Sequence, residues 1–177
     1  MYMENIGKYE EVYDRELEHL TLVECMLENT KFPVKRKNDK NQDRKNVFYG
    51  DEEITAMCLG LVKNYWYKES LYPAANNRKH PELLEALREL IKLHNPEFEY
   101  TSIQVNKNTK TNWHFDKNNI GLSYCIGIGD GGIMFENDIF VENDRKWFKY
   151  DGKNNKHKTI QNGETRYAII YFTRMNR

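Results

Sequence analysis

The chain has few cysteines and no long apolar run. Its three cysteines, Cys25, Cys58 and Cys125, lie far apart without a C-x-x-C pair, which argues against a disulfide framework or a zinc knuckle. Residues 1–20 are acidic and lack an apolar run, so we exclude a signal peptide, and no segment approaches the length of a membrane span. We therefore expect a soluble intracellular protein, in the cytoplasm or the nucleus, with no membrane partner.

The sequence also lacks an excess of either charge. Lys plus Arg and Asp plus Glu both number 27, so no global field recruits nucleic acid and any basic binding surface must be local. A length of 177 residues suits one domain, with a helical and loop extension over residues 1–52 and a β-core over 53–177. The oligomeric state stays open, and a monomer is compatible with these features.

Helical periodicity is found in two segments. Apolar residues recur at three- and four-residue steps between about residues 9 and 29 and, more clearly, from Pro81 to Asn95. Between these segments, ITAMCLGLV at 54–62 has the composition of a strand. Residues 33–46 show no apolar pattern after Val34 and predict a loop with a local charge of about +4.

After residue 96 the pattern changes from helical to extended. Short β-rich runs are separated by Gly, Asn and Asp, as in an antiparallel sandwich or barrel: FEYTSIQV, GLSYCIGI, GIMFENDIFV, KWFKY and RYAIIYF. Helices first and strands afterwards predict an α+β fold, in which N-terminal helices buttress a β-core.

A His-x-Asp pair, a later histidine and an arginine lie among these strands. In an extended strand residues i and i+2 share a face, so His114 and Asp116 project together. His157 comes 41 residues after Asp116, enough for about four short strands that return the chain beside the pair. Two imidazoles and one carboxylate on one face of Fe(II) leave positions open for a co-substrate and O₂. Arg166 heads an apolar strand and would need an anion there, such as a carboxylate of 2-oxoglutarate.

The ordered set carries a resemblance that an isolated His-x-Asp pair would not. Two stretches resemble the double-stranded β-helix (jelly-roll, cupin-like) core of the Fe(II)/2-oxoglutarate dioxygenases: TSIQVNKNTKTNWHFDKNNIGLSYCIGIGDGG and KWFKYDGKNNKHKTIQNGETRYAIIYF. Within that superfamily the chain most resembles small single-domain viral and microbial proteins near the TET/JBP nucleobase oxygenases, over about residues 53–173. The resemblance implies Fe(II) and 2-oxoglutarate as cofactors.

Carried over residue by residue, the resemblance implies roles for single side chains. The iron ligands would be His114, Asp116 and His157. The side chains that hold 2-oxoglutarate would be Arg166, Gln104, Asn106 and Tyr124. Asn119, next to Asn118, matches a position that contacts the target base in TET-like enzymes, although an ordinary turn asparagine would look the same in the sequence.

The glycine-rich segment Gly127–Gly132 formally satisfies G-x-G-x-x-G. A predicted strand and not a helix follows it, so the structural condition for a phosphate-binding loop fails. We expect a hairpin corner instead.

We expect a dioxygenase that hydroxylates a substrate C–H bond, preferably the methyl group of thymine or 5-methylcytosine in DNA. A base inside a duplex cannot reach an iron inside a barrel, so the base would be flipped out or single-stranded. Basic side chains of the predicted loop would hold phosphates, the candidates being Lys35, Arg36, Lys37, Arg44 and Lys45. A second polar loop that could fold over the mouth of the site contains Arg78 and His80.

Two alternatives stay open. A protein hydroxylase acting on prolyl, lysyl or asparaginyl side chains would use the same metal site, with a peptide across its mouth. A non-catalytic cupin-like metal-binding module would keep the three ligands but would not need Arg166. That arginine is therefore the sequence feature that separates an enzyme from a binding module.

Overall fold

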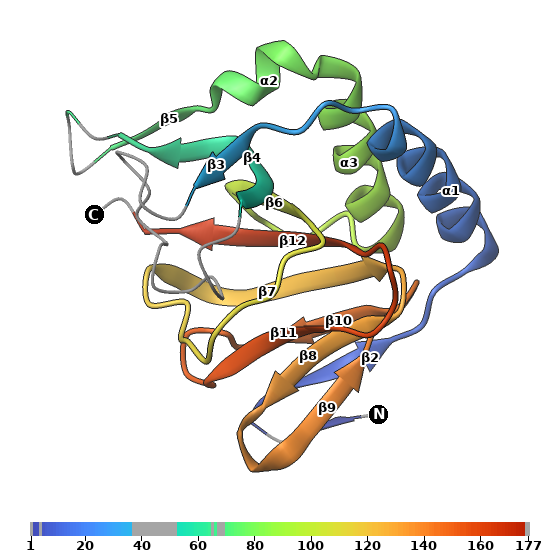
Figure 1. The fold of residues 1–177 in the computed structure, drawn as a ribbon, viewed down its shortest axis with the longest axis vertical. Helices are drawn as coiled ribbons and strands as arrows, with labels where there is room; N and C mark the ends of the chain where they lie inside the picture. The colour runs from blue at the N-terminus through green and yellow to red at the C-terminus, as the bar shows by residue number, and fades with distance from the viewer. Residues whose placement is uncertain (1, 4, 37–52, 65, 67–69, 176–177) are drawn as a thin grey trace.

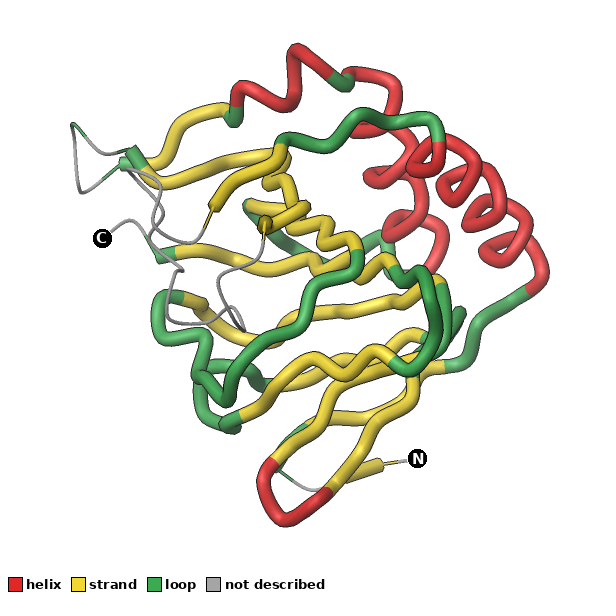
Figure 2. Tube along the Cα trace, in the orientation of Figure 1, coloured by secondary structure: helices red, strands yellow, loops and turns green. Residues whose placement is uncertain are grey.

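The computed structural model describes residues 2–3, 5–36, 53–64, 66 and 70–175. The α-helices gather on one side of the molecule and the strands form the rest (Figures 1 and 2). The helices are α1 (Asp14–Glu28), α2 (Ala75–Lys79), α3 (Pro81–His94) and the 3-10 helix η1 (Glu136–Asp138). The strands are β1 (Tyr2–Met3), β2 (Gly7–Glu10), β3 (Val34–Arg36), β4 (Glu53–Lys63), β5 (Leu71–Pro73), β6 (Ser102–Lys107), β7 (Asn119–Ile128), β8 (Gly131–Phe135), β9 (Ile139–Glu142), β10 (Trp147–Tyr150), β11 (His157–Gln161) and β12 (Tyr167–Arg174).

The larger sheet runs in the order β1, β2, β10, β7, β12, β6, β4 and β3, with β5 paired to β4. Strand β12 lies between β6 and β7 and is antiparallel to both. Helices α1 and α3 cover one face of this sheet (Figure 1). They do so because each helix presents an apolar stripe, which includes Leu20, Val23 and Leu27 of α1 and Leu83, Leu87 and Leu90 of α3.

The smaller sheet consists of β11, β8 and β9 and packs on the other face of the large sheet. Strand alternation decides which residues meet it, because Tyr124 and Ile126 of β7 face the helices while Cys125 faces the small sheet. The apolar cluster between the sheets contains Cys125, Ile133, Phe135, Val141, Phe148, Tyr150 and Ala168. Two layers of antiparallel strands with helices outside confirm the predicted α+β, jelly-roll architecture.

A buried polar cluster joins α1 and α3 to the large sheet. Glu16 of α1 is fully buried, and its Oε1 accepts a hydrogen bond from Trp147 Nε1 at 3.0 Å and lies 2.6 Å from His94 Nδ1. The other ring nitrogen of His94 lies 2.9 Å from Glu10 Oε1, to which the Tyr124 hydroxyl also donates. Each of these side chains therefore has a hydrogen-bond partner within the cluster, as stability requires of buried polar groups.

Two element boundaries differ from the sequence prediction. The first helix begins at Asp14 and not near Tyr9, because Gly7–Glu10 pairs with β10 as strand β2. Part of the predicted loop 33–46 is a strand, since Val34–Arg36 pairs with β4.

In the described part of the chain, no helix is both long enough and apolar enough to cross a membrane.

Candidate active site

Three candidate metal ligands meet in the space between the two sheets. The ligand atoms of His114, Asp116 and His157 all lie within 4.8 Å of one another. His114 Nε2 is 3.5 Å from Asp116 Oδ1, and His157 Nε2 is 3.3 Å from Asp116 Oδ2. Two nitrogens and one carboxylate at this spacing can hold one divalent metal ion.

The sequence predicted the return of the chain that brings His157 beside His114, but not the backbone conformation at His114. As predicted, four strands, β7 to β10, lie between Asp116 and His157. The His-x-Asp segment is not part of a regular strand, however. His114 and His157 form an isolated antiparallel bridge in which each backbone N–H donates to the carbonyl of the other at 2.9 Å. The Asp116 N–H donates to Gly152 O at 3.0 Å, which fixes the third ligand.

Hydrogen bonds also orient both imidazoles. His114 Nδ1 lies 2.8 Å from Asn112 O, and His157 Nδ1 lies 2.7 Å from Asn155 O. A carbonyl oxygen only accepts, so each Nδ1 donates a hydrogen bond. Each Nε2, which faces Asp116, is the nitrogen left to bind a metal.

Arg166 lies deep in the same cavity, with 3% of its surface exposed. Its Nη2 donates to Asn143 Oδ1 at 2.6 Å, and its Nε is buried without a hydrogen-bond partner. Burial lowers the pKa of the guanidinium, an effect that nearby anionic groups oppose. Burial also raises the pKa of the neighbouring Cys125 thiol, so a thiolate does not neutralise Arg166. A carboxylate would supply the missing acceptor.

The glycine-rich segment closes around Arg166. A Cβ at Gly127 would lie 2.8 Å from Arg166 Nη2, and one at Gly131, where φ is +149°, would lie 2.7 Å from Arg166 Cδ. Only glycine lets the backbone approach the guanidinium this closely. The segment is a corner, as expected, but it leads from β7 of the large sheet to β8 of the small sheet and does not form a hairpin.

The cavity has a volume of about 650 Å³, in the range of small-molecule sites. Every second residue from Arg166, which directly precedes β12, to Arg174 at its end lines the cavity, with Ala168, Ile170 and Phe172 between them. Among the described residues that line it, Asp116 is the only carboxylate, against five cationic side chains, Lys63, Lys117, Lys156, Arg166 and Arg174. The chain as a whole has no net charge, but the lining of this cavity is basic. The positive charge is therefore local, as we expected for any basic surface of a chain with balanced charges.

Most of the predicted co-substrate residues reach this cavity. Gln104 and Asn106 line it from β6, where Gln104 Nε2 donates to Asn106 Oδ1 at 2.9 Å. Tyr124 requires a correction, because it is buried in the core that faces the helices, with its hydroxyl bonded to Glu10. Its neighbour Cys125 faces the cavity instead, since successive strand residues point to opposite faces.

Only some of the predicted substrate-binding residues line the cavity. Asn118 and Asn119 line the cavity. Arg78 and His80 do not line it. In α2, Asn77 Oδ1 accepts a hydrogen bond from the Gly60 N–H and Asn77 Nδ2 donates one to the Gly60 carbonyl, which holds α2 against β4. Of the predicted basic loop, Lys35 is exposed on β3 away from the cavity lining, and the backbone of Arg36 belongs to the same strand. The remaining candidates lie outside the described residues: Lys37, Arg44 and Lys45.

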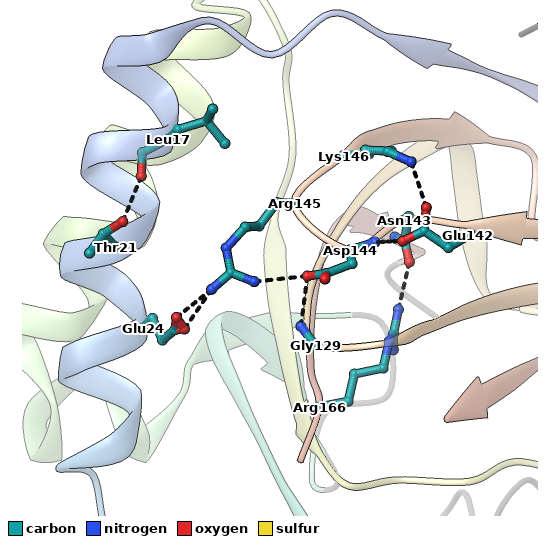
Figure 3. Close-up of polar contacts among 10 residues, drawn as sticks. All are labelled: Leu17, Thr21, Glu24, Gly129, Glu142, Asn143, Asp144, Arg145, Lys146 and Arg166. Atoms are coloured by element: carbon teal, nitrogen blue, oxygen red, sulfur yellow. Dashed lines mark hydrogen bonds and ion pairs between the residues drawn. The ribbon is translucent and has the colours of Figure 1, made fainter. Parts of the chain in front are cut away.

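Asn143 is a site residue that sequence reasoning missed. It is fully buried in the turn between β9 and β10, and it accepts the hydrogen bond from Arg166 (Figure 3). The same turn is tied to α1, because Arg145 binds both Glu24 carboxylate oxygens and also contacts Asp144, which accepts from the Gly129 N–H. No local sequence pattern marks Asn143, since its partner is 23 residues away.

Known structures share this architecture. A 2OG-Fe(II) oxygenase family protein from Burkholderia pseudomallei matches 97% of this chain and 88% of its own, at 14% identity and a TM-score of 0.58. NgTET1, solved in complex with 5mC DNA, matches 93% of this chain and 70% of its own, at 14% identity and a TM-score of 0.53. OsALKBH1 matches 98% of this chain and 100% of its own, at 10% identity and a TM-score of 0.58.

Sequence comparison adds no relative, because neither a family model nor a curated protein matches the chain. TM-scores of 0.53–0.58 over nearly the whole chain show a common fold, whereas identities of 10–14% leave individual residues to be argued from their own contacts. The protein has the fold of the 2OG-Fe(II) oxygenases, with a His-Asp-His cluster and a buried arginine in one cavity.

Proposed function

We propose that this protein is an Fe(II)- and 2-oxoglutarate-dependent oxygenase that hydroxylates a C–H bond of its substrate. The observation that supports this most is the presence, in one cavity, of the His114–Asp116–His157 donor set and of Arg166 with an unpartnered buried Nε. The donor set fits Fe(II), and the guanidinium fits a carboxylate of 2-oxoglutarate. Burying an arginine without an anion is costly, so a metal-binding module alone does not account for it.

Each side chain would have a definite task in such a reaction. His114 and His157 would hold the metal through Nε2, with Asp116 as the anionic ligand. Arg166 would fix the far carboxylate of the co-substrate, held in place by Asn143. When bound, Fe(II) and 2-oxoglutarate would supply the electrons that activate O₂, with 2-oxoglutarate oxidised to succinate and CO₂, while the apolar side chains of Ala168 and Ile170 limit the access of water.

For the substrate we infer the methyl group of thymine or 5-methylcytosine in DNA. The basic lining of the cavity favours an anionic partner, and the half-exposed rings of Trp113 and Phe115 at its edge offer faces on which a base could stack. NgTET1, which shares the fold, was solved with 5mC DNA. The target base would have to leave the duplex or come from a single strand to reach the ligands.

The test is to incubate the protein with Fe(II), 2-oxoglutarate and DNA containing thymine and 5-methylcytosine, and to analyse the nucleosides by mass spectrometry. We expect an oxidised methyl group and an equivalent amount of succinate. His114→Ala should abolish both products and also remove Co(II) binding, measured from its visible absorption. His19→Gln is the matched control, because His19 contacts Ala86 O on the helix side and does not line the cavity.

Other products would change the assignment. If every nucleoside is unchanged but a peptide gains oxygen, the substrate inference is wrong and the chain is a protein hydroxylase. If the protein binds metal but converts no 2-oxoglutarate with any substrate, it is a cupin-like binding module.

A further inference from the structure

Strand β12 carries two arginines on the same face, one at each end of the cavity. Arg166 directly precedes the strand and Arg174 ends it. Both line the cavity, as do Ala168, Ile170 and Phe172 between them. Eight residue steps along an extended strand cover roughly 26 Å. A five-carbon dicarboxylate held by Arg166 is too short to reach Arg174 as well. Arg174 is therefore available to a different ligand.

The Arg174 side chain is held in place but incompletely paired. Its guanidinium carbon lies 5.8 Å from the centre of the Phe172 ring, and its backbone N–H donates to Thr101 Oγ1 at 2.9 Å. Its Nε is buried and has no hydrogen-bond partner. A buried donor without an acceptor costs free energy, and a ligand oxygen would remove that cost.

The surroundings of Arg174 are basic. Arg174 pairs in register with Asn119, and the Met175 N–H donates to Asn118 O, so the turn that contains Lys117 lies beside it. Lys63 ends β4 and lines the same cavity. The single carboxylate of the described lining, Asp116, belongs to the metal cluster. Several cations around an arginine favour a phosphate, whose oxygens match the fork of guanidinium donors.

We propose that Arg174 binds a phosphate group of the substrate at the end of the cavity opposite Arg166. This inference rests on the proposed function, because it assigns the outer anion site to the DNA strand that carries the target base. A phosphodiester next to the flipped or single-stranded nucleotide would contact Arg174 while the base points toward the metal cluster. This contact with the phosphate would then come from the lining of the cavity itself.

The test measures binding without turnover. The protein is loaded with Fe(II) and 2-oxoglutarate in the absence of O₂, and binding of a thymine-containing single-stranded oligonucleotide is followed by fluorescence anisotropy at several salt concentrations. Arg174→Gln should weaken binding about 10-fold. It should also lower the slope of log K against log[salt] by about 0.7, the value for one single-strand phosphate contact. Arg174→Lys should keep most of the slope, because the charge remains.

Controls separate a phosphate contact from a general effect. Arg88→Gln removes the same charge from an exposed position of α3, outside the cavity, and should leave affinity and slope unchanged. Circular dichroism checks that Arg174→Gln stays folded. A parallel titration with thymidine 5′-monophosphate identifies the source of the phosphate. A loss for both ligands indicates a terminal phosphate, whereas a loss for the oligonucleotide alone indicates the backbone.

The two proposals fail in different ways. If folded Arg174→Gln binds oligonucleotide and mononucleotide with wild-type affinity and slope, or if the wild-type protein binds neither, the phosphate site is refuted. Oxidised nucleosides would in that case still support the proposed function. If Arg174→Gln loses binding but the wild-type protein leaves all bases unchanged, the phosphate site stands and methyl oxidation is wrong.

Discussion

Asn143 and Arg166 are joined inside the protein by a hydrogen bond of 2.6 Å from Arg166 Nη2 to Asn143 Oδ1. The Asn143 side chain is itself oriented, because its Nδ2 donates to the Cys125 thiol sulfur at 3.3 Å. Asn143 takes up one guanidinium hydrogen with a neutral oxygen and itself adds no negative charge beside Arg166. It therefore orients the arginine without competing for the anion that Arg166 would bind.

Replacing Asn143 should impair the use of 2-oxoglutarate. Asn143→Ala removes a hydrogen bond to a charged group, worth about 1.5–3 kcal/mol, so the KM for 2-oxoglutarate should rise at least about 10-fold. The rise in KM should exceed any fall in kcat, because the residue does not touch the reacting atoms. Initial rates of succinate formation over a range of 2-oxoglutarate concentrations measure both quantities.

A charged variant separates a positioning role from a merely structural one. Asn143→Asp keeps the size and the acceptor oxygen but adds a negative charge, which would pair with Arg166 and raise the KM further. Asn162→Ala, an exposed asparagine outside the cavity lining, is the control. If Asn143→Asp has the wild-type KM, Arg166 does not bind the co-substrate carboxylate.

The sequence predicted those parts of the site that depend on short-range order. Asp116 lies two residues after His114, His157 follows, and Arg166 heads an apolar strand, so these four residues form the ordered set that carried the family resemblance. Asn143 was not predicted, because it meets Arg166 only through the return of β10 beside β7. Tyr124 was assigned to the wrong face because the register of β7 decides between Tyr124 and Cys125, and a one-residue shift exchanges them.

The helices and strands of the fold were predicted, but the buried polar contacts that join them were not. The leucine periodicity of 81–95 gave the correct helix, since one strong apolar stripe defines α3. The carboxylate of Glu16 looks like an ordinary surface charge in the sequence, yet it is fully buried. Its carboxylate oxygens lie within hydrogen-bond distance of three groups. The Tyr13 N–H is local in the chain, whereas Trp147 Nε1 and His94 Nδ1 are distant in sequence. Such long-range pairing leaves no periodic signal.

Removing this carboxylate should destabilise the protein strongly. Glu16→Ala leaves the Trp147 N–H and one His94 nitrogen buried without their acceptor, which should lower the free energy of unfolding by about 3–5 kcal/mol. Urea denaturation followed by tryptophan fluorescence measures the change. Glu18→Ala, an exposed position of the same helix, should change it by less than about 0.5 kcal/mol. Equal effects of both variants would show that the cluster around Glu16 contributes little.

The metal site should be sensitive to a residue that is not a ligand. A Cβ at Gly152 would lie 2.5 Å from Asp116 Oδ2 and 3.2 Å from His157 Cε1. Gly152→Ala should therefore displace two ligands and weaken Co(II) binding about 10- to 100-fold, as loss of a supporting contact does at other metal sites. Isothermal titration calorimetry gives the affinity.

Gly163→Ala is the matched control for this variant. A Cβ at Gly163 would meet Asp130 Cβ at 3.5 Å, an ordinary contact, so metal affinity should not change. Wild-type affinity in Gly152→Ala would mean that the ligands do not bind metal in the arrangement seen here.

Asn119 should affect how efficiently oxidation is directed to the base. It lines the cavity three residues after Asp116 and pairs in register with Arg174, so it lies between the metal cluster and the proposed phosphate site. If its amide orients the base, Asn119→Ala loses one hydrogen bond worth about 0.5–1.5 kcal/mol, and the ratio of oxidised base to succinate should fall about 2- to 10-fold. Nucleoside mass spectrometry and a succinate assay on the same reaction give this ratio, with Asn162→Ala as the control. An unchanged ratio would mean that Asn119 does not contact the base and that another side chain orients it.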